Sequence, residues 1–276
     1  GMVCHETYKD KNNNWLSPEE VISEDGKKFF IKDNKNESVI VGPSESMSKS
    51  KKNTIDPEVM IEQYGADSVR WFILSDSPPE KDVQWSSTGV ASSNKFLQKI
   101  WNLVIQIIAR TEKKVDKKIS EKFNLDVDVL SYKIDKAIEE FKFNVAIAHF
   151  YEIYKIFVKN IDLETSNVTL NNNITKVLKL MIPFTPHLAR ECLEKLNCKD
   201  PNKWPMIKED FLENIKFAIQ VNGKTRDIIE VKKGLNEETI NSIVVEVSKA
   251  NKFIKDKKIL KKIFVKDKII NYIIKK

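Results

Sequence analysis

A run of lysine and serine residues between positions 44 and 58, SESMSKSKKNTIDPE, is the part of the chain best suited to phosphate chemistry. Lys49, Lys51 and Lys52 stand among small hydroxyl residues, just before an Asp-Pro-Glu helix start. A lysine ammonium in a mobile loop of small residues can bind a phosphate oxygen as a point charge. The segment is not a P-loop, because the chain has no GxxxxGK[ST] pattern.

A plain solvated linker is the alternative interpretation of this segment. Only four of the 47 basic residues are Arg, so lysine runs such as KSKK arise often by chance. The lysines therefore gain meaning only from their neighbours. Those neighbours are a β-rich stretch before the segment and a helix start after it.

Composition favours a basic globular protein with an anionic partner. The length of 276 residues suits about two domains, and the net charge of +7 with a pI near 9.0 puts nucleic acid first among partners. No apolar run approaches the roughly 20 residues that cross a bilayer, so no membrane association is expected. The cysteines form no CxxC pair, which is typical of reduced thiols in a cytosolic protein. No metal site is expected, because the possible ligands are scattered along the chain: Cys4, Cys192, Cys198, His5, His149 and His187.

The elements that must position the lysine loop are short strands before it and helices after it. Residues 1–42 read as strands and turns, with a hairpin signal at Asp25-Gly26. A helix is predicted to begin at the Asp56-Pro57 cap, and Asp67 is expected to cap the next one. Apolar residues at near-3.6 spacing predict further helices over 87–110, 126–140 and 143–160, then a helix, a break at 183–187 and another helix.

The pattern changes after residue 205. The stretch FAIQVNGKTRDIIEV alternates on both sides of Asn222-Gly223, which predicts a two-residue hairpin. A helix over 236–249 and strands over 261–266 and 269–274 complete a ββαββ module. The fold class expected is α+β, mainly α, with domains at 1–55, 56–205 and 212–276.

A resemblance to a known family begins in the lysine loop. Residues 47–50, MSKS, match the last four positions of the KMSKS signature of class I aminoacyl-tRNA synthetases. The stretches that follow, including IDPEVMIEQYGADSVRWFILSDSPPEKDVQW, KFLQKIWNLV, FNVAIAHF, PFTPHLAREC and QVNGKTR, resemble leucyl-tRNA synthetase of bacterial type in the same order. The resemblance covers essentially the whole chain. It implies a β-rich remnant of a catalytic domain, a helical anticodon-binding-like domain and a small C-terminal tRNA-binding domain.

The resemblance also implies an activity and a set of site residues. The family joins leucine to ATP, with Mg²⁺, and passes the leucyl group to tRNA(Leu). Its ATP-binding loop corresponds here to Ser46, Met47, Ser48, Lys49 and Ser50, with Lys49 as the catalytic lysine. Residues 51–53, Lys51, Lys52 and Asn53, extend this loop, and Asn53 is expected to turn the chain. Lys224 and Arg226, beyond the hairpin tip, are candidate tRNA contacts.

Two departures from the family pattern qualify these expectations. Ser46 stands where the signature has its first lysine, which is expected to weaken docking of the loop. The other family signature, His-x-Gly-His, does not occur in this sequence. The chain is therefore expected to be the C-terminal part of a longer enzyme, inactive alone, with no tightly bound cofactor.

Two other function classes stay open at this point. One is a related class I synthetase for another aliphatic amino acid, and the other is a free-standing tRNA-binding module without catalysis. A cytoplasmic monomer is expected in each case. Plain structural roles are expected for Trp71, Trp85, Trp101, His149 and His187.

Overall fold

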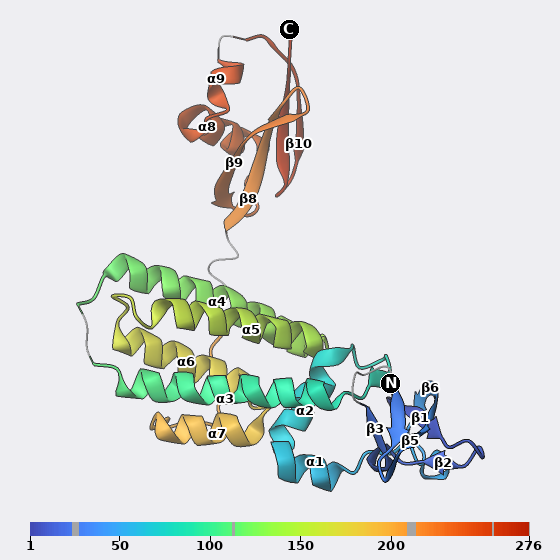
Figure 1. Cartoon of the computed structure of the whole chain (residues 1–276). Coiled ribbons are helices and arrows are strands. Elements are labelled where there is room, and N and C mark those ends of the chain that lie inside the picture. The colour runs from blue at the N-terminus through green and yellow to red at the C-terminus, as the bar shows by residue number, and fades with distance from the viewer. Residues whose placement is uncertain (24–27, 112–113, 209–213, 256, 276) are drawn as a thin grey trace. The chain divides into compact units, whose positions relative to one another are not determined.

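The computed structural model describes residues 1–23, 28–111, 114–208, 214–255 and 257–275. The chain divides into two compact units, an N-terminal unit of residues 1–207 and a C-terminal unit of residues 208–276. The fold is mixed helix and sheet, with helices predominating in the first unit and strands in the second (Figure 1). Among the described helices, none is long and apolar enough to cross a membrane.

The N-terminal unit opens with a small sheet in which β1 (Val3–Lys9) is central. β6 (Ile40–Ser46) and β2 (Trp15–Leu16) pair with it antiparallel, and β7 (Val83–Gln84) pairs with it in parallel. A Cβ at Gly42 would lie 2.4 Å from the Thr7 hydroxyl, so any larger residue there would have to displace the Thr7 side chain where β6 approaches β1.

A second sheet joins β3 (Val21–Ser23), β4 (Phe29–Ile31) and β5 (Asn34–Ser38), preceded by the short helix η1 (Pro18–Glu20). β3 and β4 pair antiparallel, with Ser23 opposite Phe29. The turn predicted at Asp25-Gly26 lies outside the described residues. The strands on either side of it are arranged as a hairpin requires.

The rest of the N-terminal unit is a helical bundle. Its helices are α1 (Pro57–Tyr64), α2 (Ala66–Asp76), α3 (Ser87–Ala109), α4 (Lys117–Glu139), α5 (Phe143–Asn160), α6 (Asn167–Met181) and α7 (Pro186–Lys195). The longer helices α3 to α6 run alongside one another and enclose one apolar core (Figure 1). Aromatic side chains fill much of that core: the helices contribute Trp71, Phe123, Phe150 and Phe157, and the turn between α6 and α7 contributes Phe184.

Two helix starts differ from the prediction. α4 begins at Lys117 and not near 126, because Asp116 caps it by accepting a hydrogen bond from the Ile119 amide at 3.0 Å. α2 begins at Ala66, so Asp67 lies inside its first turn and does not cap it. Gly65, at a φ of 81°, takes the cap position between α1 and α2.

The C-terminal unit is a four-stranded sheet covered by helices. Its elements are β8 (Asn214–Val221), β9 (Lys224–Lys232), α8 (Glu237–Val247), α9 (Asn251–Ile254), β10 (Ile259–Val265) and β11 (Ile269–Ile274). The strand order is β10-β11-β8-β9, with β11 parallel to β8. Ile240 and Val244 of α8 pack with Phe217, Ile270 and Tyr272 of the sheet.

The hairpin predicted at Asn222-Gly223 joins β8 to β9, with Val221 opposite Lys224. Both turn residues have positive φ, 50° for Asn222 and 77° for Gly223. That conformation matches the twist of the strands and favours Asn-Gly at these two positions.

Candidate functional site

The lysine loop leaves the end of β6 and is attached to β1. Ser46 pairs with Cys4 across the strands, and the Met47 amide donates to the Val3 carbonyl at 3.2 Å. The Met47 side chain packs against the apolar cluster that contains Phe72 and Trp85. The first half of the MSKS segment is therefore fixed by backbone pairing and by apolar burial.

The lysines themselves lie on the single 3-10 turn η2 (Lys49–Lys51) and just after it. The chain turns at Lys52, whose φ of 53° is left-handed. The sequence interpretation placed this turn at Asn53, and that is wrong. Asn53 instead has no exposed surface, and its side chain bonds to the backbone on both sides of the loop.

The three lysines have different surroundings. Lys51 forms an ion pair with Glu45 of β6. Lys52 lies 3.8 Å from a carboxylate oxygen of Glu20 in η1. Lys49 is exposed, and its side-chain ammonium has no ion pair or hydrogen bond with any residue that the structure describes. Of the three ammonium groups, the one at Lys49 is thus available to an anionic ligand.

Hydroxyl groups surround the exposed lysine. Ser48 and Ser50 hold their side-chain oxygens 2.8 Å apart, so one donates to the other. Further along, Asp56 accepts a hydrogen bond from the Glu58 amide at 2.9 Å and caps α1, as the Asp-Pro-Glu pattern predicted. The loop thus lies between two anchored elements, β6 and α1.

The candidate nucleic-acid contacts in the C-terminal unit lie on β9, and both are exposed. The guanidinium carbon of Arg226 lies over the Phe253 ring, 4.4 Å from its centroid, in a cation–π contact. Lys252 lies 5.2 Å from the same ring and adds a second cation. The sequence interpretation missed Phe253 and Lys252, because no local spacing relates α9 to β9.

Asp227, next to Arg226 on β9, binds the segment that joins α8 to α9. Its carboxylate accepts hydrogen bonds from the Ser248 hydroxyl and from the Lys249 amide, both at 2.7 Å. These hydrogen bonds hold the pKa of Asp227 below its ordinary value, and the bond from the Ser248 hydroxyl contributes most. The segment between α8 and α9 is thereby fixed beside Arg226.

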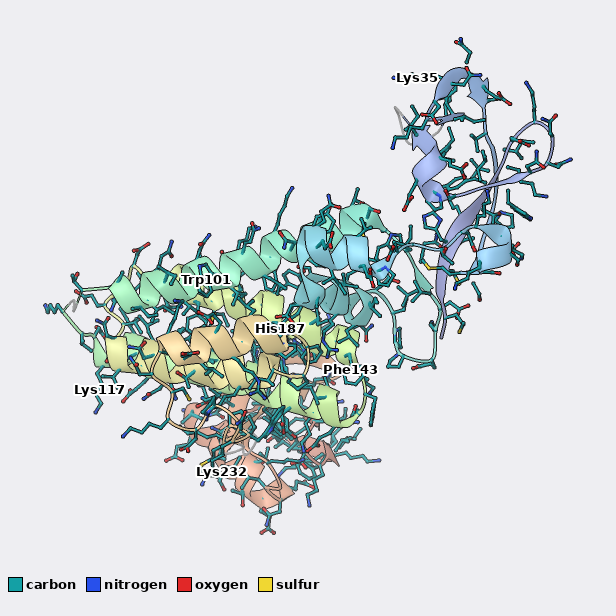
Figure 2. All side chains as sticks on the ribbon, turned by 90° about the horizontal axis from the view of Figure 1, so that it is seen from below. Lys35, Trp101, Lys117, Phe143, His187 and Lys232 are labelled. Atoms are coloured by element: carbon teal, nitrogen blue, oxygen red, sulfur yellow. The ribbon has the colours of Figure 1, made fainter. Side chains whose placement is uncertain are left out.

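The aromatic and histidine residues have the structural roles expected of them. Trp71 is completely buried and its indole donates to the Tyr151 hydroxyl at 3.3 Å, while Trp85 is buried in a neighbouring cluster. Trp101 on α3 is half-buried beneath the Lys195 ammonium (Figure 2). His149 lies within α5, and His187 lies at the start of α7 with an exposed side chain (Figure 2).

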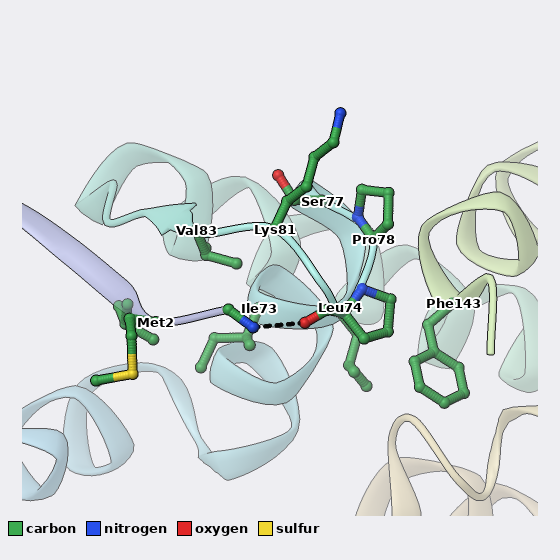
Figure 3. Close-up of a pocket in the computed structure, with 11 residues that line it drawn as sticks. Met2, Ile73, Leu74, Ser77, Pro78, Lys81, Val83 and Phe143 are labelled. Atoms are coloured by element: carbon green, nitrogen blue, oxygen red, sulfur yellow. Dashed lines mark hydrogen bonds between the residues drawn. The ribbon is translucent and has the colours of Figure 1, made fainter. Parts of the chain in front are cut away.

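A separate apolar pocket of about 190 Å³ lies between β1 and the end of α2. Met2 and Phe143 lie on opposite sides of it, and the Gly1 nitrogen donates to the Pro79 carbonyl at 2.6 Å (Figure 3). None of its lining residues belongs to the lysine loop. Within the described part of the chain, no group of three or more His, Cys, Asp or Glu side chains could hold a metal ion.

Comparison with family models gives two matches. Residues 116–241 match the anticodon-binding domain of tRNA ligases. Residues 38–86, which include the lysine loop, match the class I tRNA synthetases of the I, L, M and V group. Together these matches cover the loop, most of the bundle and part of the C-terminal unit.

Individual relatives agree with the family models. The leucine–tRNA ligases of Rickettsia massiliae and Rickettsia bellii are each 39% identical to the chain over 280 aligned residues. Each alignment covers 99% of this chain and 33% of the relative, so the chain spans about a third of the length of these proteins. Among solved structures, the ternary complex of Agrobacterium radiobacter K84 agnB2 LeuRS with tRNA and LeuAMS shares the fold. Its TM-score is 0.65 at 23% identity, over 84% of this chain and 31% of that one.

Proposed function

Because the chain is homologous to the C-terminal region of leucyl-tRNA synthetases, we propose that it supplies the ATP-binding loop and the tRNA-binding parts of such an enzyme. The intact enzyme activates leucine with ATP and transfers the leucyl group to tRNA(Leu). In this proposal residues 46–50 are the KMSKS-type loop, residues 56–205 the helical anticodon-binding-like domain and residues 212–276 a ββαββ tRNA-binding domain. Residues 1–55 belong to the catalytic domain. The enzyme acts as a cytoplasmic monomer.

The observation that carries the catalytic part is the exposed ammonium of Lys49, which is unpaired among the described residues. In leucine activation a carboxylate attacks the α-phosphate of ATP, and negative charge moves to the departing pyrophosphate. An ammonium positioned on those oxygens stabilises the transition state more than the ground state. Lys49 can do this at no cost to an existing ion pair, whereas Lys51 and Lys52 would first leave Glu45 and Glu20.

The serines of the loop complement that charge. Ser46 replaces the first lysine of the family signature, so this loop brings one cation fewer to the phosphates. The hydroxyls of Ser48 and Ser50 bond to each other and can each turn to a phosphate oxygen instead. Mg²⁺ bound with ATP would neutralise further phosphate charge in the intact enzyme.

Two surfaces support the tRNA part of the proposal. The bundle matches the anticodon-binding family model from residue 116 onward. In the C-terminal unit, Arg226 and Lys252 bring two cations to the Phe253 ring, and Lys224 is exposed two residues before Arg226 on β9. Phosphate oxygens and stacked bases are the groups that such an arrangement binds.

The test compares Lys49→Ala with Lys52→Ala in the full-length synthetase that contains this chain. Each change removes one ammonium from the loop, so their net charges are identical. Lys49→Ala is expected to slow adenylate formation by about 10²–10³ in single-turnover assays, the usual loss for one transition-state contact. Lys52→Ala is expected to change it by less than about threefold. Equal losses would mean that the loop acts only as a diffuse positive patch.

A further inference from the structure

The side chain of Asn53 is buried although it follows three lysines and lies on a surface loop. Its exposed fraction is 0%, while Lys49 and Lys52 beside it are exposed. Burial of an amide is costly unless its donors and acceptor are all paired. The hydrogen bonds of the Asn53 side chain must therefore compensate for its burial.

Those hydrogen bonds connect the loop to both neighbouring strands. The Asn53 oxygen accepts from the Ser48 amide at 2.8 Å. The Asn53 nitrogen donates to the His5 carbonyl of β1 at 3.2 Å and to the Glu45 carbonyl of β6 at 3.3 Å, with the Ser46 carbonyl at 3.5 Å. One side chain thus uses its acceptor on the loop and its donors on the sheet.

The result is a closed turn that carries Lys49. Ser48 and Asn53 are the two ends of the turn, and the left-handed conformation of Lys52 directs the chain back to bring them together. The turn is attached to β1 at both ends, through Met47 to Val3 and through Asn53 to His5. The Cα of Lys49 directly follows the residue whose amide Asn53 binds, so its position depends on that bond.

We propose that Asn53 is a positioning residue, which holds the turn so that Lys49 reaches the phosphates of ATP. The inference rests on the proposed function of Lys49 and goes beyond it, because Asn53 has no charge and its side chain is buried against the backbone of the chain. An alanine at position 53 would leave the Ser48 amide and the strand carbonyls without these partners. Lys49 would then be one of many exposed lysines, free to point in several directions.

The first experiment measures the turn without reference to catalysis. Hydrogen exchange of the Ser48 amide is followed in this chain and in its Asn53→Ala variant, with circular dichroism to check the fold. Exchange is expected to become roughly 3–10-fold faster, the change that loss of one hydrogen bond gives. Unchanged exchange would overturn the proposal, since Asn53 would then not hold the turn.

The second experiment is a double-mutant cycle in the full-length synthetase. Asn53→Ala alone is expected to slow adenylate formation at least about tenfold, because ordering a reacting group is a large part of catalysis. In the Lys49→Ala background the same change is expected to have almost no further effect, since Asn53 acts through Lys49. Additive losses, or no loss from Asn53→Ala alone, would overturn the proposal.

Asn173→Ala is the matched control, because Asn173 is 1% exposed and its amide bonds to Asn124 and to the Thr169 carbonyl within the bundle. It is expected to lower stability but to show no coupling to Lys49; coupling as strong as that of Asn53 would overturn the proposal. If Asn53→Ala does not fold, Asn53→Asp keeps the size and the acceptor and enters the same cycle. If Lys49→Ala alone leaves adenylate formation unchanged, the proposed function of Lys49 fails. If Lys49→Ala slows adenylate formation and the effect of Asn53→Ala simply adds to it, only the role of Asn53 is refuted.

Discussion

The carboxylate of Asp67, within α2, accepts a hydrogen bond from the backbone amide of Leu188, in the first turn of α7, at 2.7 Å. The same carboxylate lies 3.4 Å from the His187 amide and 3.0 Å from its ring nitrogen Nδ1. Asp67 therefore caps a helix whose first turn contains His187, 120 residues later in the sequence. A negative charge at this position also complements the dipole of α7.

Replacing Asp67 by Ala is expected to destabilise the N-terminal unit by about 1–2 kcal/mol, because the cap is lost and two part-buried backbone amides lose their acceptor. The measurement is urea unfolding of the chain, followed by helical circular dichroism. His187→Ala is the control: its side chain is 78% exposed, so its loss is expected to change stability by less than about 0.5 kcal/mol. Equal effects would show that the ring contact, and not the cap, stabilises α7.

Local patterns in the sequence predicted several elements well. The apolar spacing of residues 143–160 defined α5 at the bounds that the structure has, and Asn222-Gly223 defined a hairpin. These features depend on residues close in sequence, where periodicity and turn chemistry are informative. The start of α4 was missed because its first turns, KKISEKFN, contain few apolar residues and are fixed by the cap at Asp116.

Relations between distant segments could not be predicted in the same way. Nothing in the local pattern shows that β11 pairs in parallel with β8, or that Asp67 serves α7. The candidate site has the same limit. The sequence showed three lysines in one loop, but the carboxylates that form ion pairs with Lys51 and Lys52 come from β6 and η1. The signature singled out Lys49, but only the structure shows that the other two lysines of the loop, Lys51 and Lys52, have carboxylate partners.

The cysteines are expected to differ in reactivity. Burial, and then the nearby Glu191, raises the pKa of the Cys192 thiol to about 12. At pH 8 only about 10⁻⁴ of it is thiolate, the reactive form. Cys198 is partly exposed, so a thiol reagent is expected to label it at least about tenfold faster than Cys192 or the buried Cys4. Mass spectrometry of the labelled chain checks the order, and Cys198→Ser should remove the fast phase while Cys192→Ser leaves it intact.

The C-terminal unit is expected to lose stability in acid through Asp227. Hydrogen bonds from the Ser248 hydroxyl and the Lys249 amide lower the pKa of Asp227 from 3.8 in the folded unit. A carboxylate whose pKa is lower in the folded state stabilises the fold fully at a pH above its unfolded-state pKa. This stabilisation is lost as the pH falls through the folded-state pKa. Exchange protection of the Lys249 amide should therefore decrease below about pH 4. Asp227→Asn should make that protection lower at pH 7 and nearly independent of pH; parallel curves for the two proteins would contradict this role.

Removal of residues 208–276 is expected to weaken tRNA binding while the helical bundle stays folded. The bundle core contains only residues of the N-terminal unit, and the sheet of the C-terminal unit has its own apolar cluster. Circular dichroism of the truncated chain and filter binding of tRNA are the paired measurements. Loss of the helical signal on truncation would show that the two clusters depend on each other for folding.

The cations on β9 are expected to account for part of that binding. Phosphate contacts release counterions, so the logarithm of tRNA affinity falls with the logarithm of salt concentration, by about one unit of slope for each contact. Lys224→Ala with Arg226→Ala is therefore expected to weaken binding at low salt and to reduce the slope by about two. The measurement is filter binding of tRNA to the whole chain at several salt concentrations.

Lys257→Ala with Lys258→Ala is the matched control for that pair, because these two lysines are also exposed and also lie in the C-terminal unit. Both double variants remove the same charge, so a long-range electrostatic effect would lower affinity equally in the two proteins. A direct contact would lower the affinity more in the Lys224 and Arg226 variant, since Arg226 is already positioned against the Phe253 ring. Equal salt-dependence slopes in the two double variants would refute a specific role for Lys224 and Arg226. The contribution of the C-terminal unit to tRNA binding would then be due to its net charge.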